Sequence, residues 1–402
     1  MDIEIIMYNM SCFCEWQKGI SNRNYQVFKK LANHPKVKRI IAVDFLPFTV
    51  KRAARNWLEN IAYSPMIGET GKIEKKYKGL TSQMIKISGY KAEVYVFSTI
   101  NSIISYKLVS KTLNKFINKI YYKAPLKTKR VIWSYFPMTV DYFENIDSDL
   151  TVFDAVDNWI YHESFGNYRY TLRKNYKTIA KKSDLIFTVS KELVDFFQKI
   201  GAKDNVKWIS NGVELKRFKN AKPLTSKELP LNIKHPIVGY IGTIQDRFRV
   251  NLVKYLAKKN PDKSFLIVGP VWAGVNIEKI KILPNVYLIG RVPYNKACRY
   301  IKSFDVGIIP HKNDRFVKYT NSLKILEYLA CSKPVVTTPG SGVERFSEIV
   351  EIKEKKQEFN KALNKILKPD YMNKQIYQDA LAQHNWKYKA DKMLDVIFKK
   401  LS

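Results

Sequence analysis

The chain has 402 residues, 46% of them hydrophobic and 26% charged, and 70 lysines and arginines against 36 aspartates and glutamates give a formal charge of +34. This composition excludes an intrinsically disordered chain. A single core rarely grows beyond roughly 250 residues, so the length predicts two domains. The excess of positive charge favours an anionic partner, which could be nucleic acid, a membrane surface or a phosphorylated substrate.

The cysteines and the amino terminus bear on the compartment. Cys12, Cys14, Cys298 and Cys331 do not have the paired spacing of a zinc site, so we expect reduced thiols in a cytoplasmic protein. The first residues, MDIEIIMYNM, are typical of a strand rather than of a signal peptide. No apolar run is long enough to span a bilayer, so a role at the cell membrane would place the protein on its inner face.

In the first half of the chain, short β-branched runs alternate with amphipathic segments, the pattern of a parallel sheet covered by helices. Expected strands are residues 2–8, 37–45, 92–98, 130–136, 150–157, 184–190 and 206–210, with helices at 22–34 and 190–202. We therefore expect a doubly wound, Rossmann-like domain over residues 1–213. A polar, proline-containing stretch at 214–235 is interpreted as a linker.

A second alternation follows the linker and predicts a second Rossmann-like domain over residues 236–378. Its expected strands are 236–243, 264–270, 285–292, 306–310 and 334–339, separated by helices at 249–260, 276–283, 294–304 and 321–331. Residues 379–402 have no strand after them, and we expect a helix that crosses back to the first domain. Parallel α/β sheets bind ligands at the carboxyl ends of their strands, so two such domains would face each other across a cleft.

The stretch YTNSLKILEYLA, residues 319–330, carries the clearest candidate site. Asn321, Lys324 and Glu327 are spaced by three and share one side of the predicted helix. A cation is unfavourable at the positive end of a helix, but Lys324 and the free N–H groups there could together hold a phosphate. Glu327, one turn deeper, could accept hydrogen bonds from two ribose hydroxyls. The alternative is an ordinary solvated polar face.

A second candidate element is VGYIGTIQDRFR, where an expected strand ends at Gly242 and Thr243. Glycine permits the backbone to approach a phosphate closely, and Arg247 or Arg249 could neutralise its charge. The glycine spacing is G-x-x-G rather than G-x-G-x-x-G, so no dinucleotide cofactor is expected.

The run NSLKILEYLACSKPVV resembles the donor-binding signature of GT-B glycosyltransferases, in particular sequence family 4 and its relatives in bacterial polysaccharide synthesis. Further runs occur in the order and spacing typical of that family: TVFDAVDNW, KKSDLIFTVSKEL, ISNGVELKRF, PIVGYIGTIQDRF, FLIVGP, PNVYLIGRVPY and FDVGIIPH. The resemblance covers residues 130–345 well and the first 130 only loosely. It implies two Rossmann-like domains and transfer of a sugar from a nucleoside diphosphate donor.

The resemblance also implies roles for single residues. The donor diphosphate would be contacted by Gly242, Thr243, Lys324 and the backbone N–H groups of Ser322 and Leu323, and the ribose by Glu327. Many family 4 members have a second glutamate eight residues earlier, where this chain has Tyr319, so contact with the sugar would fall to Asn321 or the preceding loop. The basic residues after the first glycine loop are out of register, and Arg247 is assigned the phosphate role.

Two residues of the first domain are candidates for acid–base chemistry. Asp157 follows an expected strand and His162 comes five residues later. If Asp157 reached the acceptor hydroxyl, it could act as a general base and the product anomer would be inverted. The resemblance to family 4 instead implies retention, without such a base. A structural alternative for Asp157 is a helix cap. Asp147 and Asp149 form a D-x-D in an expected turn, so no metal ion is expected.

Residues 103–123 place lysines at 107, 111, 115, 119 and 123, four apart along one helix face. Like charges at that spacing repel, unless an anionic surface offsets them. The apolar side of this helix, which includes Leu108, Leu113, Phe116 and Ile117, suits the interface of an anionic membrane. The alternative is a helix that packs this side on the domain's own sheet.

These observations predict a glycosyltransferase that moves a sugar from a nucleoside diphosphate sugar to a glycan or lipid-linked acceptor in cell-surface polysaccharide biosynthesis. The alternatives are a nucleotide-sugar epimerase of the same fold and a basic nucleic-acid-binding protein. No nucleic-acid module or aromatic stacking platform is recognisable, so nucleic acid is not the expected partner.

Overall fold

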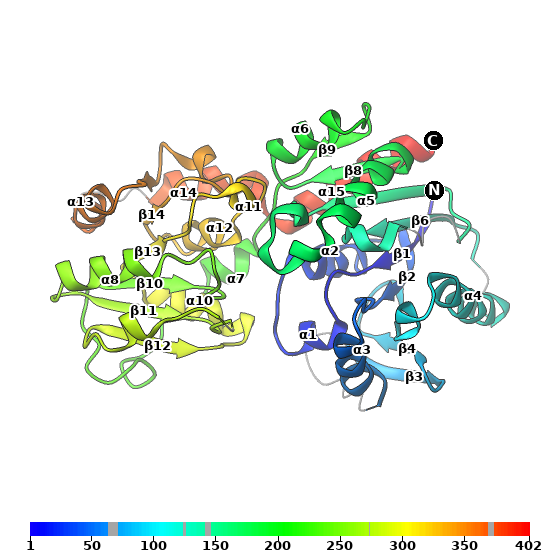
Figure 1. Cartoon of the computed structure of the whole chain (residues 1–402), viewed down its shortest axis with the longest axis horizontal. Coiled ribbons are helices and arrows are strands. Elements are labelled where there is room, and N and C mark those ends of the chain that lie inside the picture. The colour runs from blue at the N-terminus through cyan, green and yellow to red at the C-terminus, as the bar shows by residue number, and fades with distance from the viewer. Residues whose placement is uncertain (63–70, 124–125, 141–145, 273, 369–373) are drawn as a thin grey trace. The chain divides into compact units, whose positions relative to one another are not determined.

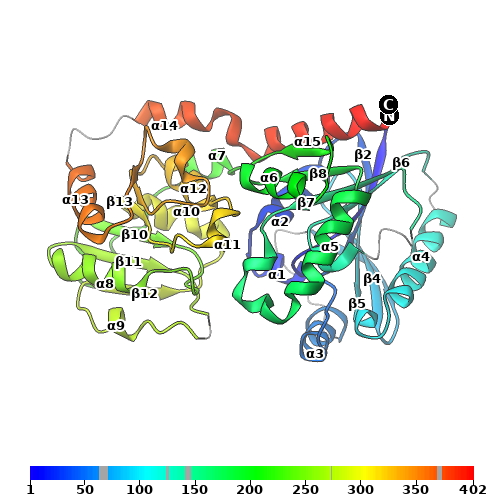
Figure 2. The ribbon, with the colours of Figure 1, turned by 45° about the horizontal axis from the view of Figure 1, so that its top comes forward.

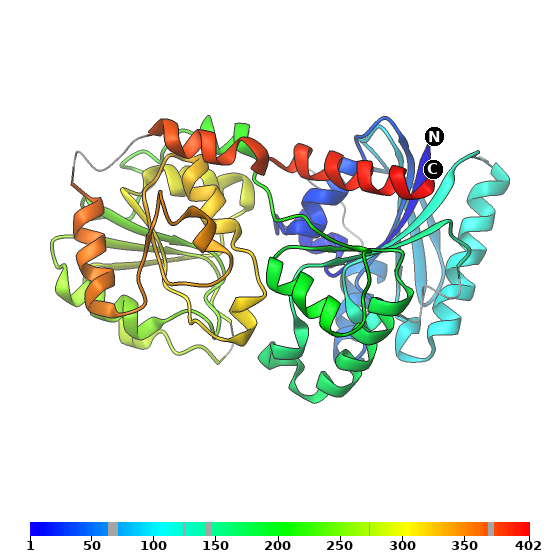
Figure 3. The same cartoon turned by 90° about the horizontal axis from the view of Figure 1, so that it is seen from above.

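The computed structural model describes residues 1–62, 71–123, 126–140, 146–272, 274–368 and 374–402, and forms two compact units (Figure 1). The first unit comprises Met1–Ile209 and Ala390–Ser402, and the second comprises Ser210–Lys389. Both ends of the chain belong to the first unit, where they lie close together in each view (Figures 2 and 3).

The first unit is built on a nine-stranded sheet of order β3-β4-β5-β2-β1-β6-β7-β8-β9. Its parallel strands are β1 (Ile3–Tyr8), β2 (Val37–Val43), β5 (Glu93–Thr99), β6 (Lys129–Ser134), β7 (Leu150–Ala155), β8 (Leu185–Thr188) and β9 (Val206–Trp208). The sequence predicted each of these strands. All except β9 are β-branched or aromatic runs that are mostly buried, whereas β9 is a short edge strand that is mostly exposed.

The sheet is mixed, which corrects the expectation of a purely parallel one. Strands β3 (Lys72–Lys78) and β4 (Ser82–Ser88) form an antiparallel hairpin that extends the sheet beyond β5. The sequence did not reveal β3 because it is an edge strand whose side chains are mostly exposed and largely lysine. Charged residues on an edge strand hinder pairing with another chain, but they also remove the hydrophobic alternation that identifies a strand.

The helices of the first unit include the expected ones at 22–34 and 190–202. Their bounds are α1 (Phe13–Gln17), α2 (Arg23–Leu31), α3 (Val50–Asn56), the short helix η1 (Trp57–Ala62), α4 (Tyr106–Lys123), α5 (Arg169–Lys182), α6 (Lys191–Lys199) and the second part of α15 (Trp386–Leu401). Asn22 caps α2 through the backbone N–H of Tyr25, and Ser190 caps α6 through that of Leu193. These caps explain why both helices begin where they do.

The apolar side of α4 is buried inside the first unit. Val109, Leu113 and Ile117 pack with Ile6 and Phe97 of the sheet in one hydrophobic cluster, and α4 lies beside β4 and β5 in Figure 2. This corrects the expectation that the apolar side meets a membrane, because burial against the sheet occupies it. The described part of the chain contains no helix that is long and apolar enough to cross a membrane.

The second unit is built on a six-stranded sheet of order β12-β11-β10-β13-β14-β15. Its strands are β10 (Ile237–Ile241), β11 (Ser264–Val268), β12 (Val286–Gly290), β13 (Val306–Ile309), β14 (Val335–Thr337) and β15 (Glu351–Ile352), and all pairs are parallel. The sequence predicted all but β15, whose two residues are too few to form a pattern.

Helices cover both faces of this second sheet, as expected for a doubly wound domain. One hydrophobic cluster joins a face of the sheet to α8 (Val250–Lys259), α9 (Glu278–Lys281) and α13 (Lys356–Ile366). The other cluster joins the opposite face to α7 (Leu215–Lys219), α10 (Tyr294–Ser303), α12 (Leu323–Ala330) and α14 (Lys374–Leu381). Figure 1 shows α8 and α13 on one side of this unit. The short helix α11 (Arg315–Lys318) precedes α12.

The boundaries between the units differ from the expected ones. Residues 214–235, interpreted as a linker, belong to the second unit, because Phe218 of α7 is fully buried against Tyr294. The preceding residues also belong there, since the N–H of Val213 donates to the carbonyl of His384 at 2.7 Å. Residues up to Lys389 group with the second unit, and Ala390–Ser402 group with the first.

Candidate functional site

The candidate site of the second unit lies at the point where its strand order reverses. β10 has β11 on one side and β13 on the other, so the connections from β10 and β13 leave in opposite directions. In open α/β sheets, ligands bind outside the carboxyl ends of the strands at such a point. Gly242 follows β10 there, and the N–H of Lys312 donates to the carbonyl of Arg247, which ties the two connections together.

Gly242 allows the side chain of Lys324 to lie directly on the backbone. Its φ of +139° is one that other residues rarely adopt. A Cβ on Gly242 would come within 2.3 Å of Lys324 Cε and 2.7 Å of its Nζ, so any side chain would push the lysine away. Gly269 behind it has a φ of +143°, and its Cβ would lie 2.0 Å from the carbonyl oxygen of Gly242. Gly242 therefore makes room for the lysine, and Gly269 makes room for the backbone of Gly242.

The ammonium of Lys324 is held in a cationic environment. The pKa of Lys324 is lowered to about 7, mainly by burial and also by the neighbouring Arg247, while Glu327 opposes the shift. The ammonium also lies 5.4 Å from the centre of the Tyr240 ring. Desolvation and a like charge both disfavour the protonated amine, so an anion bound beside it would restore the charge.

Arg247 and His311 have buried nitrogens without hydrogen-bond partners. The Nε of Arg247 and the Nδ1 of His311 are both in this state. The Nε2 of His311 lies 3.3 Å from the hydroxyl of Tyr240, and burial, Arg247 and Lys324 together lower the pKa of His311, which is therefore neutral. A buried donor without an acceptor costs roughly 1–3 kcal/mol, so Arg247 is arranged for an acceptor that a ligand would bring.

The start of α12 completes the cationic side of the site. Ser322 is the N-cap residue, but no side chain caps the helix, and the hydroxyl of Ser322 is buried without a partner. Leu323 is the first helical residue, so its N–H and that of Lys324 are among those that a helix leaves without intrahelical acceptors. These groups and Lys324 form an arrangement suited to a phosphate.

Glu327 lies one turn deeper and is 8% exposed. Its carboxylate accepts a hydrogen bond from the hydroxyl of Tyr294 at the start of α10. The pKa of Glu327 is raised to about 7, mainly by burial and slightly by the nearby Glu214, while Lys324 and the hydrogen bond from Tyr294 act in the opposite direction. With one hydrogen bond from Tyr294, the carboxylate keeps capacity for further donors such as a pair of vicinal hydroxyls.

Asn321 and Thr243 are placed at the site, but each has a structural partner. The side-chain oxygen of Asn321 accepts from the N–H of Asn211 at 3.0 Å, and its backbone oxygen accepts from the Asn211 side chain at 2.8 Å. Asn321 therefore fixes the start of α12 against residues 210–213, and this contact does not support its predicted role in binding the sugar. The carbonyl of Thr243 accepts from the hydroxyl of Tyr240 at 3.1 Å.

Asp157 and His162 belong to the first unit. The backbone oxygen of Asp157 accepts from the hydroxyl of Tyr176 at 2.9 Å, and the cap of the following turn is Asn158 rather than Asp157. The Nδ1 of His162 accepts from the N–H of Ser164 at 3.1 Å, and its ring packs against Trp159 and Phe165. These contacts give His162 a structural role, and they leave the catalytic roles of both residues as predictions.

The D-x-D at 147–149 lies in the loop before β7. Asp149 accepts from the backbone N–H of Arg130 and from Lys129, both at 2.7 Å, and so joins the loop to β6. In the described residues, histidine, cysteine, aspartate and glutamate side chains do not gather into a group of three that could hold a metal ion.

Several residues of the site escaped the sequence analysis. Tyr240 and Tyr294 each lie within or beside an apolar run, where the sequence carries no signal that separates them from core residues. Asn211 follows the expected strand at 206–210, and His311 follows the one at 306–310, where ligands of parallel sheets are expected to bind. Only the packing of β10, α10 and α12 brings these side chains to Lys324 and Glu327.

Comparison with known proteins gives a family match over part of the chain. Residues 249–395 match a family model described as "Glycosyl transferase-like". The chain is 30% identical over 138 residues to the "Putative teichuronic acid biosynthesis glycosyltransferase TuaH" of Bacillus subtilis (strain 168). That alignment spans 34% of this chain and 35% of the relative, about a third of each.

Solved structures match nearly the whole chain at low sequence identity. Sucrose-phosphate synthase from Thermosynechococcus elongatus has a TM-score of 0.68 at 14% identity, with 98% of both chains covered. HepE from Anabaena, solved in complex with UDP, has a TM-score of 0.64 at 13% identity, with 99% of this chain and 100% of that chain covered. TarM has a TM-score of 0.61 at 10% identity, over 100% and 99% of the two chains. This likeness shows that the chain has the GT-B fold.

Proposed function

We propose that this protein is a glycosyltransferase that moves a sugar from a nucleoside diphosphate sugar to a glycan or lipid-linked acceptor in cell-surface polysaccharide biosynthesis. The observation that carries the proposal is the position of Lys324, seated on Gly242 and beside Arg247 at the uncapped start of α12. Two cations held together at a helix amino terminus repel one another, and a bound diphosphate would offset that cost. The name of the TuaH relative supports the assignment to polysaccharide synthesis.

The proposed chemistry follows from the charges of the site. When the bond between the sugar and the diphosphate breaks, negative charge develops on the leaving phosphate. Lys324, Arg247 and the N–H groups of Leu323 and Lys324 would stabilise that charge, and Gly242 and Thr243 would let the phosphates approach the backbone. The N–H of Ser322 already donates to the carbonyl of Ser341 at 2.9 Å, which does not support its predicted role in binding the diphosphate. Glu327 would hold the ribose through its hydroxyls. These positive groups provide the charge that a metal ion supplies elsewhere, so we propose that the reaction is independent of metal.

We further propose retention of the anomeric configuration, on the resemblance to sequence family 4. In that course, the acceptor oxygen bonds to the anomeric carbon on the face that the phosphate leaves, and the acceptor's proton passes to a leaving phosphate oxygen. No protein base is then required. Inversion would instead require Asp157 to take that proton. NMR of the product's anomeric proton distinguishes the two outcomes directly.

The outer side of α4 supports a location at an anionic membrane surface, which we propose as part of this function. Lys107, Lys111 and Lys115 are exposed there, together with Leu108 and, just before the helix, Ile104. The side chain of Lys123 lies outside the described residues. Basic residues near an anionic bilayer contribute about 1 kcal/mol each. Flotation with vesicles that contain phosphatidylserine, but not with neutral vesicles, is expected, and loss of flotation in the Lys107, Lys111, Lys115→Gln triple variant would locate the contact.

The donor site is tested by thermal-shift titration with UDP, GDP, ADP and CMP. A ligand that binds only the folded state raises the melting temperature with its concentration. We expect one nucleoside diphosphate to stabilise the protein, and Lys324→Ala and Glu327→Ala each to weaken that effect by at least about tenfold in ligand concentration. Lys318→Ala and Glu348→Ala are matched controls, because both side chains are exposed.

A second readout separates the roles of the two residues. Loss of Lys324 removes the partner of the diphosphate, so binding of the free nucleoside should change little. Loss of Glu327 removes the partner of the ribose, so binding of nucleoside and nucleotide should fall together. Wild-type nucleotide affinity in both variants would refute the proposed donor site. Interconversion of two nucleotide sugars without an acceptor would instead identify an epimerase.

A further inference from the structure

Three segments of the first unit meet beside the end of β5, and each carries exposed apolar side chains. They are the turn between β3 and β4, the short helix η1, and the turn between β5 and α4. Leu80 is 92% exposed, Ile104 is 70% exposed, and Trp57 and Ile103 are each 39% exposed. A single exposed apolar residue is ordinary on a protein surface, but several on segments that touch one another indicate an interaction site.

Hydrogen bonds hold the three segments together. The indole N–H of Trp57 donates to the carbonyl of Leu80 at 3.1 Å, which joins η1 to the β3–β4 turn. The carbonyl of Thr81 accepts from the N–H of Ile100 at 3.1 Å and from the hydroxyl of Thr99 at 3.2 Å, which joins the same turn to the end of β5. These contacts place four exposed side chains at one end of the sheet, which we call the Leu80 surface: Trp57, Leu80, Ile103 and Ile104.

The polar groups beside the Leu80 surface already have partners. The indole N–H is the single polar atom of the Trp57 side chain, and the carbonyl of Leu80 accepts its hydrogen bond. The carbonyl of Thr81 is also occupied. Polar groups without partners are costly in an apolar medium, whereas these would enter it with their hydrogen bonds made. Turns usually present polar residues or glycine, so a leucine exposed at a turn also suits an apolar partner better than water.

The segments that form the Leu80 surface are strongly basic. Residues 71–88 contain five lysines and one glutamate, and residues 99–119 contain four lysines and no acidic residue. Lys78 precedes Leu80 by two positions, and Lys107 and Lys111 follow Ile104 on the first turns of α4. All three lysines are exposed. The apolar side chains are therefore accompanied by positive charge.

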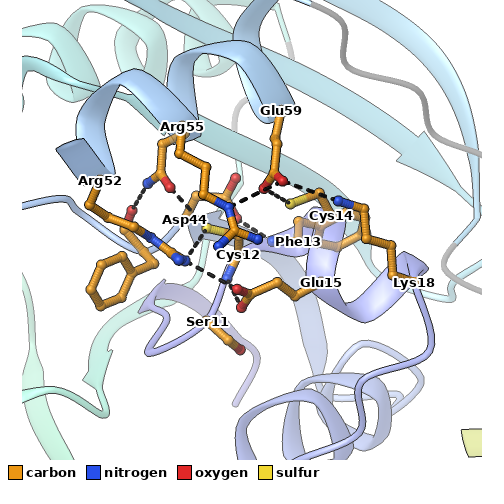
Figure 4. Close-up of polar contacts among 12 residues, drawn as sticks. Ser11, Cys12, Phe13, Cys14, Glu15, Lys18, Asp44, Arg52, Arg55 and Glu59 are labelled. Atoms are coloured by element: carbon orange, nitrogen blue, oxygen red, sulfur yellow. Dashed lines mark hydrogen bonds and ion pairs between the residues drawn. The ribbon is translucent and has the colours of Figure 1, made fainter. Parts of the chain in front are cut away.

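The acidic side chains of these segments are held in ion pairs. Glu74 pairs with Lys86 at 3.3 Å across the β3–β4 hairpin. Glu59, two residues after Trp57, pairs with Arg55 at 3.2 Å and with Lys18 at 3.3 Å (Figure 4). Because these carboxylates are occupied by other cations, the margin of the Leu80 surface stays positive and is complementary to an anionic partner.

We propose that the Leu80 surface inserts into an anionic bilayer, at the boundary between headgroups and acyl chains, while the lysines at its margin contact the headgroups. Leucine, isoleucine and tryptophan beside lysines are the combination that binds this boundary. The inference rests on the proposed function, which places the protein at an anionic membrane, and it adds the apolar anchor that α4 does not provide because its own apolar side is buried. A second copy of the chain is a poorer occupant, because it would bring the same lysines to the same margin.

The test is flotation of the full-length protein with vesicles of phosphatidylcholine and phosphatidylserine, at about 0.1 M and about 0.5 M salt. We expect the Leu80→Ser, Ile104→Ser double variant to lower the ratio of bound to free protein by about tenfold or more at both salt concentrations, since salt does not screen apolar burial. Both side chains are exposed, so the variant should fold. The Leu231→Ser, Ile282→Ser double variant is the matched control, because these side chains of the second unit are 86% and 75% exposed.

Quenching of tryptophan fluorescence tests insertion itself. Bromine atoms on the acyl chains quench a tryptophan that enters the apolar part of the bilayer. With vesicles of brominated phosphatidylcholine and phosphatidylserine, we expect the wild type to be quenched and Trp57→Phe to lose most of that quenching. Trp208→Phe is the matched control, because Trp208 on β9 is 37% exposed, close to the 39% of Trp57.

Three results would overturn the insertion of the Leu80 surface. One is equal flotation of the wild type and the Leu80→Ser, Ile104→Ser variant. Another is flotation of the wild type that disappears at about 0.5 M salt, because the lysines alone would then account for binding. The third is a wild type that does not float but self-associates through Leu80 and Ile104, because the surface would then join two copies of the chain.

Stabilisation by UDP, measured on the same samples, separates this inference from the proposed donor site. No flotation beside a normal response to UDP would overturn the membrane anchor and leave the donor site intact. Flotation that depends on Leu80 and Ile104, in a protein that does not respond to any nucleotide, would support the anchor and count against glycosyl transfer.

Discussion

At the scale of single residues, the proposed donor site depends on a contact between Lys324 and Gly242 that a sequence motif does not show. Lys324 is unfavourable where it stands, since it is partly buried, beside Arg247 and at the positive end of a helix. Gly242 provides the space for its side chain. In the sequence, Lys324 and Gly242 are two separate features. The structure shows that the side chain of Lys324 occupies the space that a side chain at position 242 would need.

Replacing Gly242 by alanine should therefore damage nucleotide binding more than folding. The new Cβ would lie 2.3 Å from Lys324 Cε and force the ammonium out of position. We expect UDP affinity to fall by about tenfold or more, measured by titration calorimetry. Gly201→Ala is the control, because Gly201 has a φ of +105° but nothing within 4 Å of its would-be Cβ. If Gly242→Ala and Gly201→Ala lose the same amount of stability and Gly242→Ala keeps the wild-type affinity for UDP, the assigned contact between Lys324 and Gly242 is wrong.

Binding of a diphosphate should also be accompanied by proton uptake. The pKa of Lys324 is lowered to about 7 in the free protein, so near pH 8 the amine is largely neutral. A bound diphosphate favours the charged form, and the protein should take up close to one proton per UDP at about pH 8 and much less at about pH 6. Calorimetry in buffers of different ionisation enthalpy measures this number, and Lys324→Met should eliminate the part that is due to this residue.

The raised pKa of Asp44 should make the protein less stable as the pH rises. Its pKa is raised from 3.8 to about 7 in the folded protein, mainly by burial and slightly by Glu15, while Arg52 opposes the shift. The folded state thus binds more protons than the unfolded state between these values, and stability falls as the pH rises through that window, by about 4 kcal/mol at most. Urea unfolding at several pH values should show this loss in the wild type relative to Asp44→Asn. If the difference in unfolding free energy between the wild type and Asp44→Asn does not change with pH, the pKa of Asp44 is not shifted.

At the scale of elements, α4 illustrates how one sequence pattern allows two readings. Its lysines and apolar residues fit a membrane-surface helix and a core-packed helix equally well, because both need one apolar side. The tertiary structure decides between them, since Val109, Leu113 and Ile117 are buried against β-strands of the same unit. The exposed lysines and Leu108 are left for an outside partner.

Leu113→Ala should consequently destabilise the first unit by about 2–5 kcal/mol, because it leaves a cavity in a closely packed core. Leu113 is fully buried, whereas Lys111 on the same helix is exposed. Lys111→Gln should change the unfolding free energy by less than about 0.5 kcal/mol. Urea denaturation followed by tryptophan fluorescence compares them. Similar small effects would mean that α4 does not pack on the sheet as described.

At the scale of the whole molecule, the net charge of +34 does not identify a partner. It predicts weak, non-specific attraction to polyanions, whose strength falls steeply with salt because bound counterions are released. A fluorescent oligonucleotide should bind at about 50 mM salt and lose most of its affinity by about 200 mM, while UDP binding changes far less. Sequence-specific binding that survives at 200 mM would instead favour the nucleic-acid-binding alternative.

The sequence by itself determined the two doubly wound domains, most strand positions, and Lys324 and Glu327 as the centre of a candidate site. It could do so because buried parallel strands are continuous apolar runs, and because a charged residue at the start of an otherwise apolar helix departs from a local rule. The tertiary structure alone decided the β3–β4 hairpin, the burial of α4, the structural use of Asn321 and His162, and the burial of Asp44. The burial of α4, the contact of Asn321 with Asn211 and the burial of Asp44 beside Phe13 and Ser98 depend on segments distant in sequence, and a linear pattern does not contain them. The hairpin and the contacts of His162 are local, but they carry no hydrophobic pattern that identifies them.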